Sequence, residues 1–369
     1  MIRALMSLLL LVAAEVDCVG QTWTPLYEAY ARRFLDAQIR VIDRDADDRT
    51  TSEAQAYAMF FALVANDRAR FDGLLTWTEQ NLAAGDLTAR LPGWLWGRDR
   101  ENQWRILDTN PAADADVWMA YVLLEAGRAW NEPRYTAIGS ALADRIAVEE
   151  VVRVADVGAV LLPAPTGFRQ DDAYRLNPSY MPLQLFVRLA QLLPDGLWQA
   201  VADNIPAIVR ASAPHGFATD WVGVAPGVGM TASDAGSYDA IRVYLWAGMV
   251  DPATPGRDAL GDTLAGMRTW LRAHAAPPEK VRPDGTVVSP RGPIGFSAAL
   301  LPYLAAFDNP KSEAAQLARL RSAFDSKTGL YGSPARYYDQ NLALFGLGWK
   351  ERRFWFDAHG ALKTWWKSE

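Results

Sequence analysis

Hydrophobic residues recur along most of this chain at intervals of three and four positions, and this period indicates helices rather than strands. About twelve segments show it, at residues 26–39, 53–66, 68–83, 114–130, 133–148, 178–193, 197–212, 237–249, 257–274, 294–306, 311–324 and 336–348. Several neighbouring segments are joined by only two or three residues, such as Asn66-Asp67, and links this short produce antiparallel helix hairpins.

Six helix hairpins in succession predict a closed ring in which inner helices are covered by outer ones. Residues 57–64 and 240–250 are apolar on nearly every side, as inner helices would be, whereas 133–148 and 311–324 carry the charges of outer helices. The β-branched stretch 151–162 is the best candidate for a strand. We therefore predict an all-α ring with minor β hairpin insertions.

The first 21 residues follow a different pattern from the rest of the chain. Arg3 precedes an apolar run at 4–14 that is too short to span a bilayer and that acidic residues terminate, which is typical of an export signal. No clean cleavage motif follows it. Residues 22–369 contain no linker and no later membrane-spanning run, so we predict one periplasmic or secreted domain that does not insert into a membrane.

The composition narrows the classes of partner. A net charge of -6 argues against nucleic acid and anionic membrane surfaces. The 15 Trp are more than a core requires, and some are expected to line a binding surface. The only Cys, Cys18, falls in the expected signal, and His215, His274 and His359 show no metal-binding spacing. We therefore expect neither a metal nor an organic cofactor.

Three predicted helix starts carry an acidic residue, namely Glu53, Asp114 and Asp239. Helix capping and the helix dipole explain most lone acids at such positions. These acids, however, precede almost continuous apolar runs, which would place them at the rim or floor of the cavity of the ring. One turn further on, each helix presents an aromatic or cationic side chain on the same face: Tyr57, Trp118 and Arg242.

Converging carboxylates in a Trp-rich exported chain favour chemistry on a sugar polymer. Glycoside hydrolysis needs one carboxylic acid to protonate the leaving oxygen and a second carboxylate to activate water or to attack. A helix N-terminus lowers the pKa of a carboxyl group, so Glu53 could donate a proton only if burial or a neighbouring carboxylate raised its pKa.

Six segments of the chain resemble glycoside hydrolase family 8: TSEAQAYAMFFA, LPGWLWG, ADADVWMAYVLLEAGRAW, NPSYMP, SYDAIRVYLW and GPIGFSAALLP. The resemblance extends from Trp23 to Trp349 and is strongest to the members that accompany bacterial cellulose synthase. It implies an (α/α)6 barrel that cleaves β-1,4-glucan (cellulose) with inversion, and an association with the cellulose export complex.

The resemblance also implies roles for individual residues. Glu53 matches the proton donor, and Asp239 matches the acid usually assigned as the base. Asp114 matches an acid that is described either as a nucleophile or as a group that orients the distorted sugar, so the choice of base between Asp114 and Asp239 stays open. The predicted substrate-binding residues are Tyr57, Trp94, Trp96, Asp116, Trp118, Tyr180, Tyr238 and Arg242.

Some positions depart from the family pattern, with Ala54 and Ala58 where relatives have Gly and Ala113 where they have Ser or Thr. Because every carboxylate is retained, we expect a working enzyme. The alternatives are a family member that acts on another glycan (chitosan, lichenan or xylo-oligosaccharide) and a non-catalytic glucan-binding chaperone of the export machinery.

Overall fold

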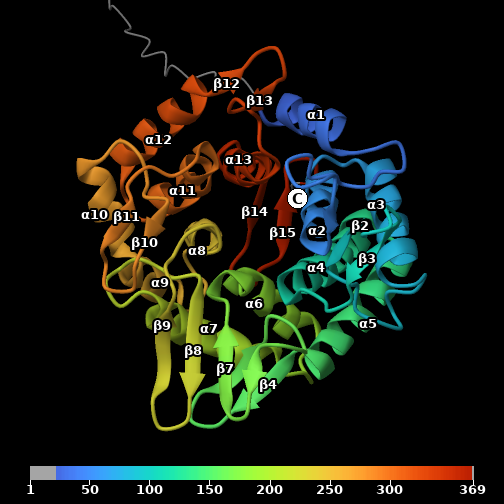
Figure 1. Cartoon of the computed structure of the whole chain (residues 1–369), viewed down its shortest axis with the longest axis horizontal. Helices are drawn as coiled ribbons and strands as arrows, with labels where there is room; N and C mark the ends of the chain where they lie inside the picture. The colour runs from blue at the N-terminus through green and yellow to red at the C-terminus, as the bar shows by residue number, and fades with distance from the viewer. Residues whose placement is uncertain (1–21, 368–369) are drawn as a thin grey trace, which may run out of the picture.

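The computed structural model describes residues 22–367, and its helices form two concentric rings (Figure 1). The inner ring consists of α2 (Ser52–Val64), α4 (Ala113–Trp130), α6 (Leu183–Leu192), α8 (Ala240–Met249), α11 (Ile294–Ala306) and α13 (Tyr337–Lys350). The outer ring consists of α1 (Trp23–Phe34), α3 (Arg68–Leu82), α5 (Pro133–Glu149), α7 (Trp198–Ser212), α9 (Arg257–Thr263), α10 (Ala265–Ala273) and α12 (Pro310–Ser322). The predicted (α/α)6 barrel is confirmed. The expected export signal lies outside the described residues.

The two rings differ in how much of each helix is buried. Every residue of α8 and nearly every residue of α2 is buried, whereas α5 buries a stripe that includes Tyr135, Ile138 and Leu142. Between inner helices the backbones come very close. A Cβ at Gly346 of α13 would lie 2.0 Å from a carbonyl oxygen of α11, so only glycine allows this approach. The ring closes where Phe345 of α13 stacks on Phe60 of α2 at 5.2 Å between ring centroids.

Three predicted helices differ in detail from the observed ones. The segment 26–39 is observed as α1, which begins at Trp23 and ends at Phe34, where the backbone becomes extended at Leu35. The segment 257–274 is divided at Leu264 into α9 and α10, and the break lets Gly266 lie against the backbone of Gly216. The segment 178–193 begins with a 3-10 turn, η1 (Pro178–Tyr180), and α6 starts only after Pro182, which lacks an N–H group and disfavours helical backbone at the residue before it.

The connections between helices carry small antiparallel sheets. The strands are β1 (Thr50–Thr51), β2 (Leu95–Arg98) and β3 (Trp104–Asp108) in one sheet; β4 (Val151–Val154) with β5 (Gly158–Leu161); β6 (Arg169–Gln170), β7 (Ala173–Leu176), β8 (Trp221–Ala225) and β9 (Gly229–Ser233) in another; β10 (Lys280–Val281) with β11 (Val287–Ser289); β12 (Phe324–Asp325) with β13 (Leu330–Tyr331); and β14 (Phe354–Phe356) with β15 (Leu362–Thr364). The strand predicted at 151–162 is the hairpin β4–β5, with Gly158 at a φ of 106° in its turn.

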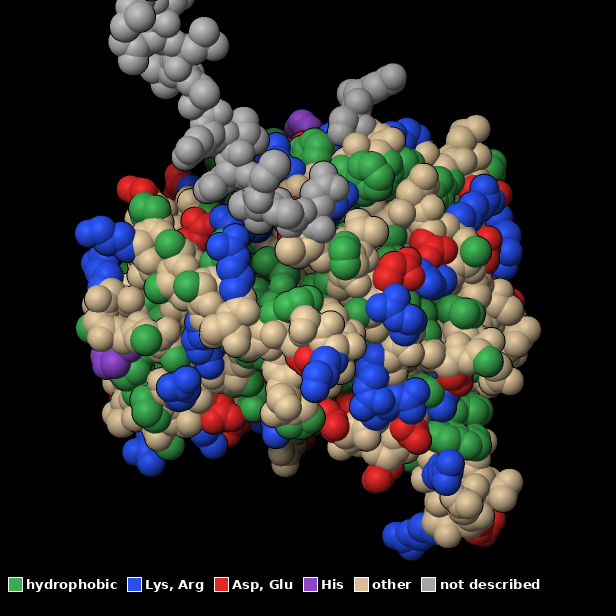
Figure 2. Space-filling model, turned by 90° about the horizontal axis from the view of Figure 1, so that it is seen from above, with side chains coloured by type: hydrophobic (Ala, Val, Ile, Leu, Met, Phe, Trp, Pro, Cys, Tyr) green, Lys and Arg blue, Asp and Glu red, His purple; other side chains and the backbone are tan. Residues whose placement is uncertain are grey.

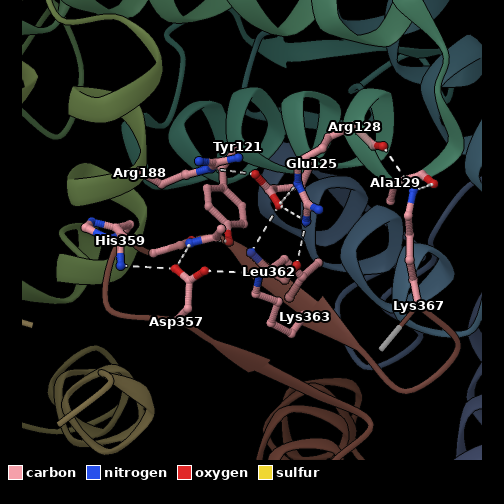
Figure 3. A network of polar contacts seen from close by, with 12 residues as sticks. Tyr121, Glu125, Arg128, Ala129, Arg188, Asp357, His359, Leu362, Lys363 and Lys367 are labelled. Carbon is pink, nitrogen blue, oxygen red and sulfur yellow. Dashed lines mark hydrogen bonds and ion pairs between the residues drawn. The ribbon is translucent and has the colours of Figure 1, made fainter. Parts of the chain in front are cut away.

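The hairpin β14–β15 closes one end of the barrel against α4 and α6 (Figure 3). Glu125 of α4 is fully buried there, and its carboxylate accepts from Arg188 Nε at 2.7 Å and from Leu362 N at 3.0 Å. Just beyond the hairpin, the indole N–H groups of Trp365 and Trp366 donate to the last carbonyls of α2. The C-terminal ends of the inner helices α2 and α4 therefore lie at this closed end, and their N-terminal ends lie at the opposite one. Within 22–367, no helix combines the length and the apolar character needed to cross a bilayer.

Candidate active site

The three predicted acids lie together at the N-terminal end of the inner ring. Glu53 is the second residue of α2, Asp114 is the second residue of α4, and Asp239 immediately precedes α8. Glu53 does not cap its own helix, since the Thr51 hydroxyl accepts from Ala54 N at 3.2 Å in that role. Thr51, rather than Glu53, is therefore the capping residue of α2.

Arg242 of α8 connects the acids and is itself only 6% exposed. Its Nη1 donates to Asp114 Oδ2 and to the Tyr57 hydroxyl, both at 3.0 Å. Its Nη2 donates to Asp239 Oδ1 at 2.6 Å and to the Ser179 hydroxyl at 3.0 Å. One planar guanidinium thus holds two carboxylates from different helices at a set separation.

Two further residues that are not among the predicted site residues hold Asp239 or the backbone on either side of it. Asn177 Nδ2 donates to Asp239 Oδ2 at 3.0 Å, while Asn177 Oδ1 accepts from Ser179. Asp220 Oδ1 accepts from the backbone N–H groups of Ser237 and Ala240. The NPSYMP segment contains Asn177 and could have revealed it, whereas no motif surrounds Asp220.

Burial raises the pKa of two of the acids, Glu53 and Asp114. Burial raises the pKa of Glu53, and this effect exceeds the lowering by its own backbone N–H and by the charge of Arg242. Glu53 Oε2 is buried without a hydrogen-bond partner. Burial and, second, the charge of Glu53 raise the pKa of Asp114 to about 8. At Glu53, the effect of burial thus outweighs the nearby N–H group and the charge of Arg242, both of which favour the ionised form, and this is the direction that a proton donor requires.

Four of the predicted substrate-binding aromatics keep accessible surface near the acids. Trp94 and Trp96 are half-buried. Trp96 lies on β2, which pairs with β1, and the carbonyl oxygen of Trp94 accepts from Ser52 N at the start of α2. Tyr180 is half-buried beside Arg242, at 5.6 Å from Arg242 Cζ to the ring centroid. Tyr238 is 40% exposed next to Asp239. These rings are placed where pyranose faces could stack on them.

The predicted substrate contacts of Trp118 and Asp116 are wrong. Trp118 is 1% exposed and packs against Phe60, Trp246 and Phe345, because it lies one turn deeper in the barrel than Asp114. Asp116 is fully buried, since two positions along a helix turn its side chain away from that of Asp114.

Asp116 instead lies against the equally buried Glu150, and no basic group within the described part of the chain pairs with either carboxyl. Tyr57 also lies beneath the site rather than on its surface, since it is 5% exposed and meets Arg242 only through its hydroxyl. Among residues 22–367, no three or more His, Cys, Asp or Glu side chains are arranged to hold a metal ion.

Carboxylic acids gathered at one end of an (α/α)6 barrel, with aromatic rings around them, define a glycoside hydrolase. The chain belongs to the glycosyl hydrolases family 8, whose family model matches residues 2–352. An endoglucanase of Escherichia coli O157:H7 is 43% identical over 99% of this chain and 97% of its own length. An endoglucanase of Xanthomonas axonopodis pv. citri (strain 306) is 43% identical over 97% of this chain and 94% of its own.

Solved structures agree with the family. The endo-1,4-D-glucanase from Vibrio fischeri ES114 superposes with a TM-score of 0.84 at 38% identity, covering 92% of this chain and 99% of that one. The family 8 endoglucanase Cel10 from Klebsiella pneumoniae has a TM-score of 0.71 at 24% identity, covering 89% and 99%, which is a likeness of fold.

Proposed function

We propose that this chain is an endo-β-1,4-glucanase that hydrolyses cellulose or a related β-1,4-glucan with inversion. One observation carries the proposal: Glu53, whose pKa burial raises, belongs to the same cluster as the half-exposed Asp239, which Arg242 and Asn177 hold by its two oxygens. A protonated acid and a fixed carboxylate are the pair that glycoside hydrolysis requires. The names of the relatives, all endoglucanases, support β-1,4-glucan as the substrate.

In the proposed reaction, Glu53 donates its proton to the glycosidic oxygen as the bond from that oxygen to the anomeric carbon breaks. Asp239 accepts a proton from a water molecule whose oxygen attacks the anomeric carbon from the opposite face. Asp114, held by Arg242, orients the sugar at the cleavage point. Glu53 then regains a proton and Asp239 releases one, both by exchange with solvent.

The decisive test is proton NMR of cellohexaose hydrolysis, following the anomeric signals of the first products, alongside Glu53→Gln. We expect the α-anomer to appear before mutarotation, and we expect the variant to lose about 10²–10⁴-fold in kcat. The variant should still bind cellopentaose in calorimetry, because the amide keeps the shape of the side chain.

Each other outcome contradicts part of the proposal. Initial β-anomer would indicate retention. Binding without cleavage by the wild type would favour the non-catalytic glucan-binding chaperone. Faster cleavage of chitosan, lichenan or xylo-oligosaccharides in a substrate panel would assign the chain to another glycan.

We also propose that the enzyme is exported to the periplasm and acts on nascent glucan beside the cellulose synthase export complex. The basic-then-apolar pattern of residues 1–21 supports export. Cell fractionation of the full chain, with a variant lacking residues 2–21 as control, tests the location. Co-purification with a tagged synthase tests the association, and recovery of the enzyme only in the unbound fraction would contradict it.

A further inference from the structure

The N-terminus of α8 is capped in an unusual way. Asp239 immediately precedes α8 but already has helical backbone (φ -78°, ψ -50°) instead of the extended backbone of a capping aspartate. Its side chain makes no hydrogen bond to the first turn of α8. One oxygen accepts from Arg242 at 2.6 Å, and the other accepts from Asn177 at 3.0 Å.

A different carboxylate performs the capping. Asp220, which immediately precedes β8, extends its Oδ1 to Ser237 N at 2.7 Å and to Ala240 N at 2.8 Å. The two segments can touch because position 236 is glycine: a Cβ there would lie 1.9 Å from the Ala218 carbonyl oxygen. Asp220 therefore holds both the turn before α8 and the first N–H group of the helix.

The surroundings of Asp220 indicate that its contact with α8 depends on an accepting oxygen rather than on a negative charge. Burial raises the pKa of Asp220 to about 6, against the lowering by the Ser237 N–H, and the charge of Asp239 raises it further. The contact with α8 uses only an accepting oxygen. A neutral amide oxygen at the same place would accept the same two hydrogen bonds.

We propose that Asp220 is a positioning residue for hydrolysis: by accepting from backbone N–H groups on both sides of Asp239, it holds the turn that directs the Asp239 carboxylate at Arg242 and Asn177. Without Asp220, the N–H groups of Ser237 and Ala240 lose their acceptor, and the turn that carries Asp239 is free to shift. The inference rests on the proposed function, in which Asp239 is the base.

Two variants separate capping from charge. Asp220→Ala removes the acceptor, and we expect kcat on cellohexaose to fall about 10–100-fold with KM changed by less than about 3-fold, because a displaced base slows chemistry rather than binding. Asp220→Asn keeps an accepting oxygen and removes the charge, and we expect it to retain kcat within about 3-fold. Crystal structures should show the Asp239 carboxylate displaced from Arg242 and Asn177 in Asp220→Ala only.

A matched control shows what loss of a carboxylate cap does elsewhere. Asp67 accepts from Arg70 N at 3.0 Å at the start of the outer helix α3, on the side where α2 ends. Asp67→Ala should lower Tm as Asp220→Ala does, with kcat unchanged.

The outcomes separate this inference from the proposed function. The inference is overturned if Asp220→Ala keeps the wild-type kcat, or if Asp220→Asn loses as much as Asp220→Ala. If Asp220→Ala does not fold, Asp220→Asn still tests the inference. It should keep kcat within about 3-fold, and its crystal structure should show Asp239 still bonded to Arg242 and Asn177. If the wild type does not cleave cellohexaose at all, the proposed function is contradicted, and the inference that depends on it is contradicted as well.

Discussion

Arg242 contributes more contacts to the site than a simple counter-ion would. Its two terminal nitrogens donate four hydrogen bonds, and all of these acceptors come from helices or loops other than its own except Asp239, which immediately precedes its helix. A lysine carries the same charge at a single point and cannot reproduce this fork.

Arg242→Lys should therefore lose at least about 100-fold in kcat, since the separation between Asp114 and Asp239 would no longer be set. Breaking buried ion pairs should also cost about 3–5 kcal/mol in the free energy of unfolding. The control is Arg188→Lys, which changes another buried arginine, 8% exposed and paired with Glu125 at the closed end of the barrel. It should lose stability and keep kcat. Equal kcat in the two variants would contradict the assigned role.

The carboxyl pair of Asp116 and Glu150 predicts a pH dependence of stability. Burial raises the pKa of both groups well above ordinary values, so the folded state retains protons that the unfolded state releases above about pH 4. This sign means that the pair costs nothing at low pH and destabilises the fold increasingly as the pH rises.

Glu150→Gln removes that cost and still offers an amide donor to Asp116. The free energy of unfolding in urea should match the wild type near pH 4 and exceed it by at least about 1 kcal/mol at pH 8. Glu149→Gln, at the exposed neighbouring position that pairs with Arg145, should show no such gain. If Glu150→Gln were less stable than the wild type at pH 8, the ionised Glu150 carboxylate would be stabilising the fold, which contradicts the prediction.

At the scale of elements, the helix starts position the site and the C-terminal hairpin stabilises the opposite end of the barrel. Helix starts hold the acids at one end of the barrel, while β14–β15 seals the other through Glu125, Arg128 and Arg188 (Figure 3). The family model stops at residue 352, before this hairpin begins.

Glu125→Ala should lower the free energy of unfolding by about 3–5 kcal/mol, because it leaves the buried Arg188 guanidinium and the more exposed Arg128 guanidinium without their carboxylate. Glu125→Gln should lose less, since an amide oxygen still accepts from Leu362 N. Below the melting temperature, both variants should keep the wild-type kcat on cellohexaose. A loss of kcat at unchanged stability would mean that the closed end is coupled to the acids.

On the scale of the whole molecule, the chain carries a net charge of -6. Over the face shown in Figure 2, acidic and basic side chains are interspersed. Such a surface neither attracts nor repels a neutral glucan over long distances.

We therefore expect kcat/KM on cellohexaose to change by less than about 2-fold between 0.05 and 0.5 M NaCl. Carboxymethylcellulose, a polyanion, should be cleaved faster as salt screens its repulsion from the acidic protein. A strong salt dependence with the neutral oligosaccharide would reveal electrostatic steering that this charge pattern does not predict.

Sequence periodicity located the helices well, because an inner helix must be apolar all round and an outer helix must have one polar face. It placed α2, α4 and α8 correctly and hence the helix starts that bear Glu53, Asp114 and Asp239. The division of residues 257–274 could not be read from that pattern, since it depends on the contact of Gly266 with a distant loop.

The sequence by itself determined the ring of helices and the three acids, because hydrophobic period and residue type are local properties of a chain. Only the tertiary structure decided which side chains share the site. It buried Trp118 and Asp116 although both lie within one turn of Asp114, and it brought Asn177 and Asp220 from separate segments to the turn that carries Asp239. Depth within the barrel and contacts between distant segments set these outcomes, and neither is encoded in the spacing of residues along one helix.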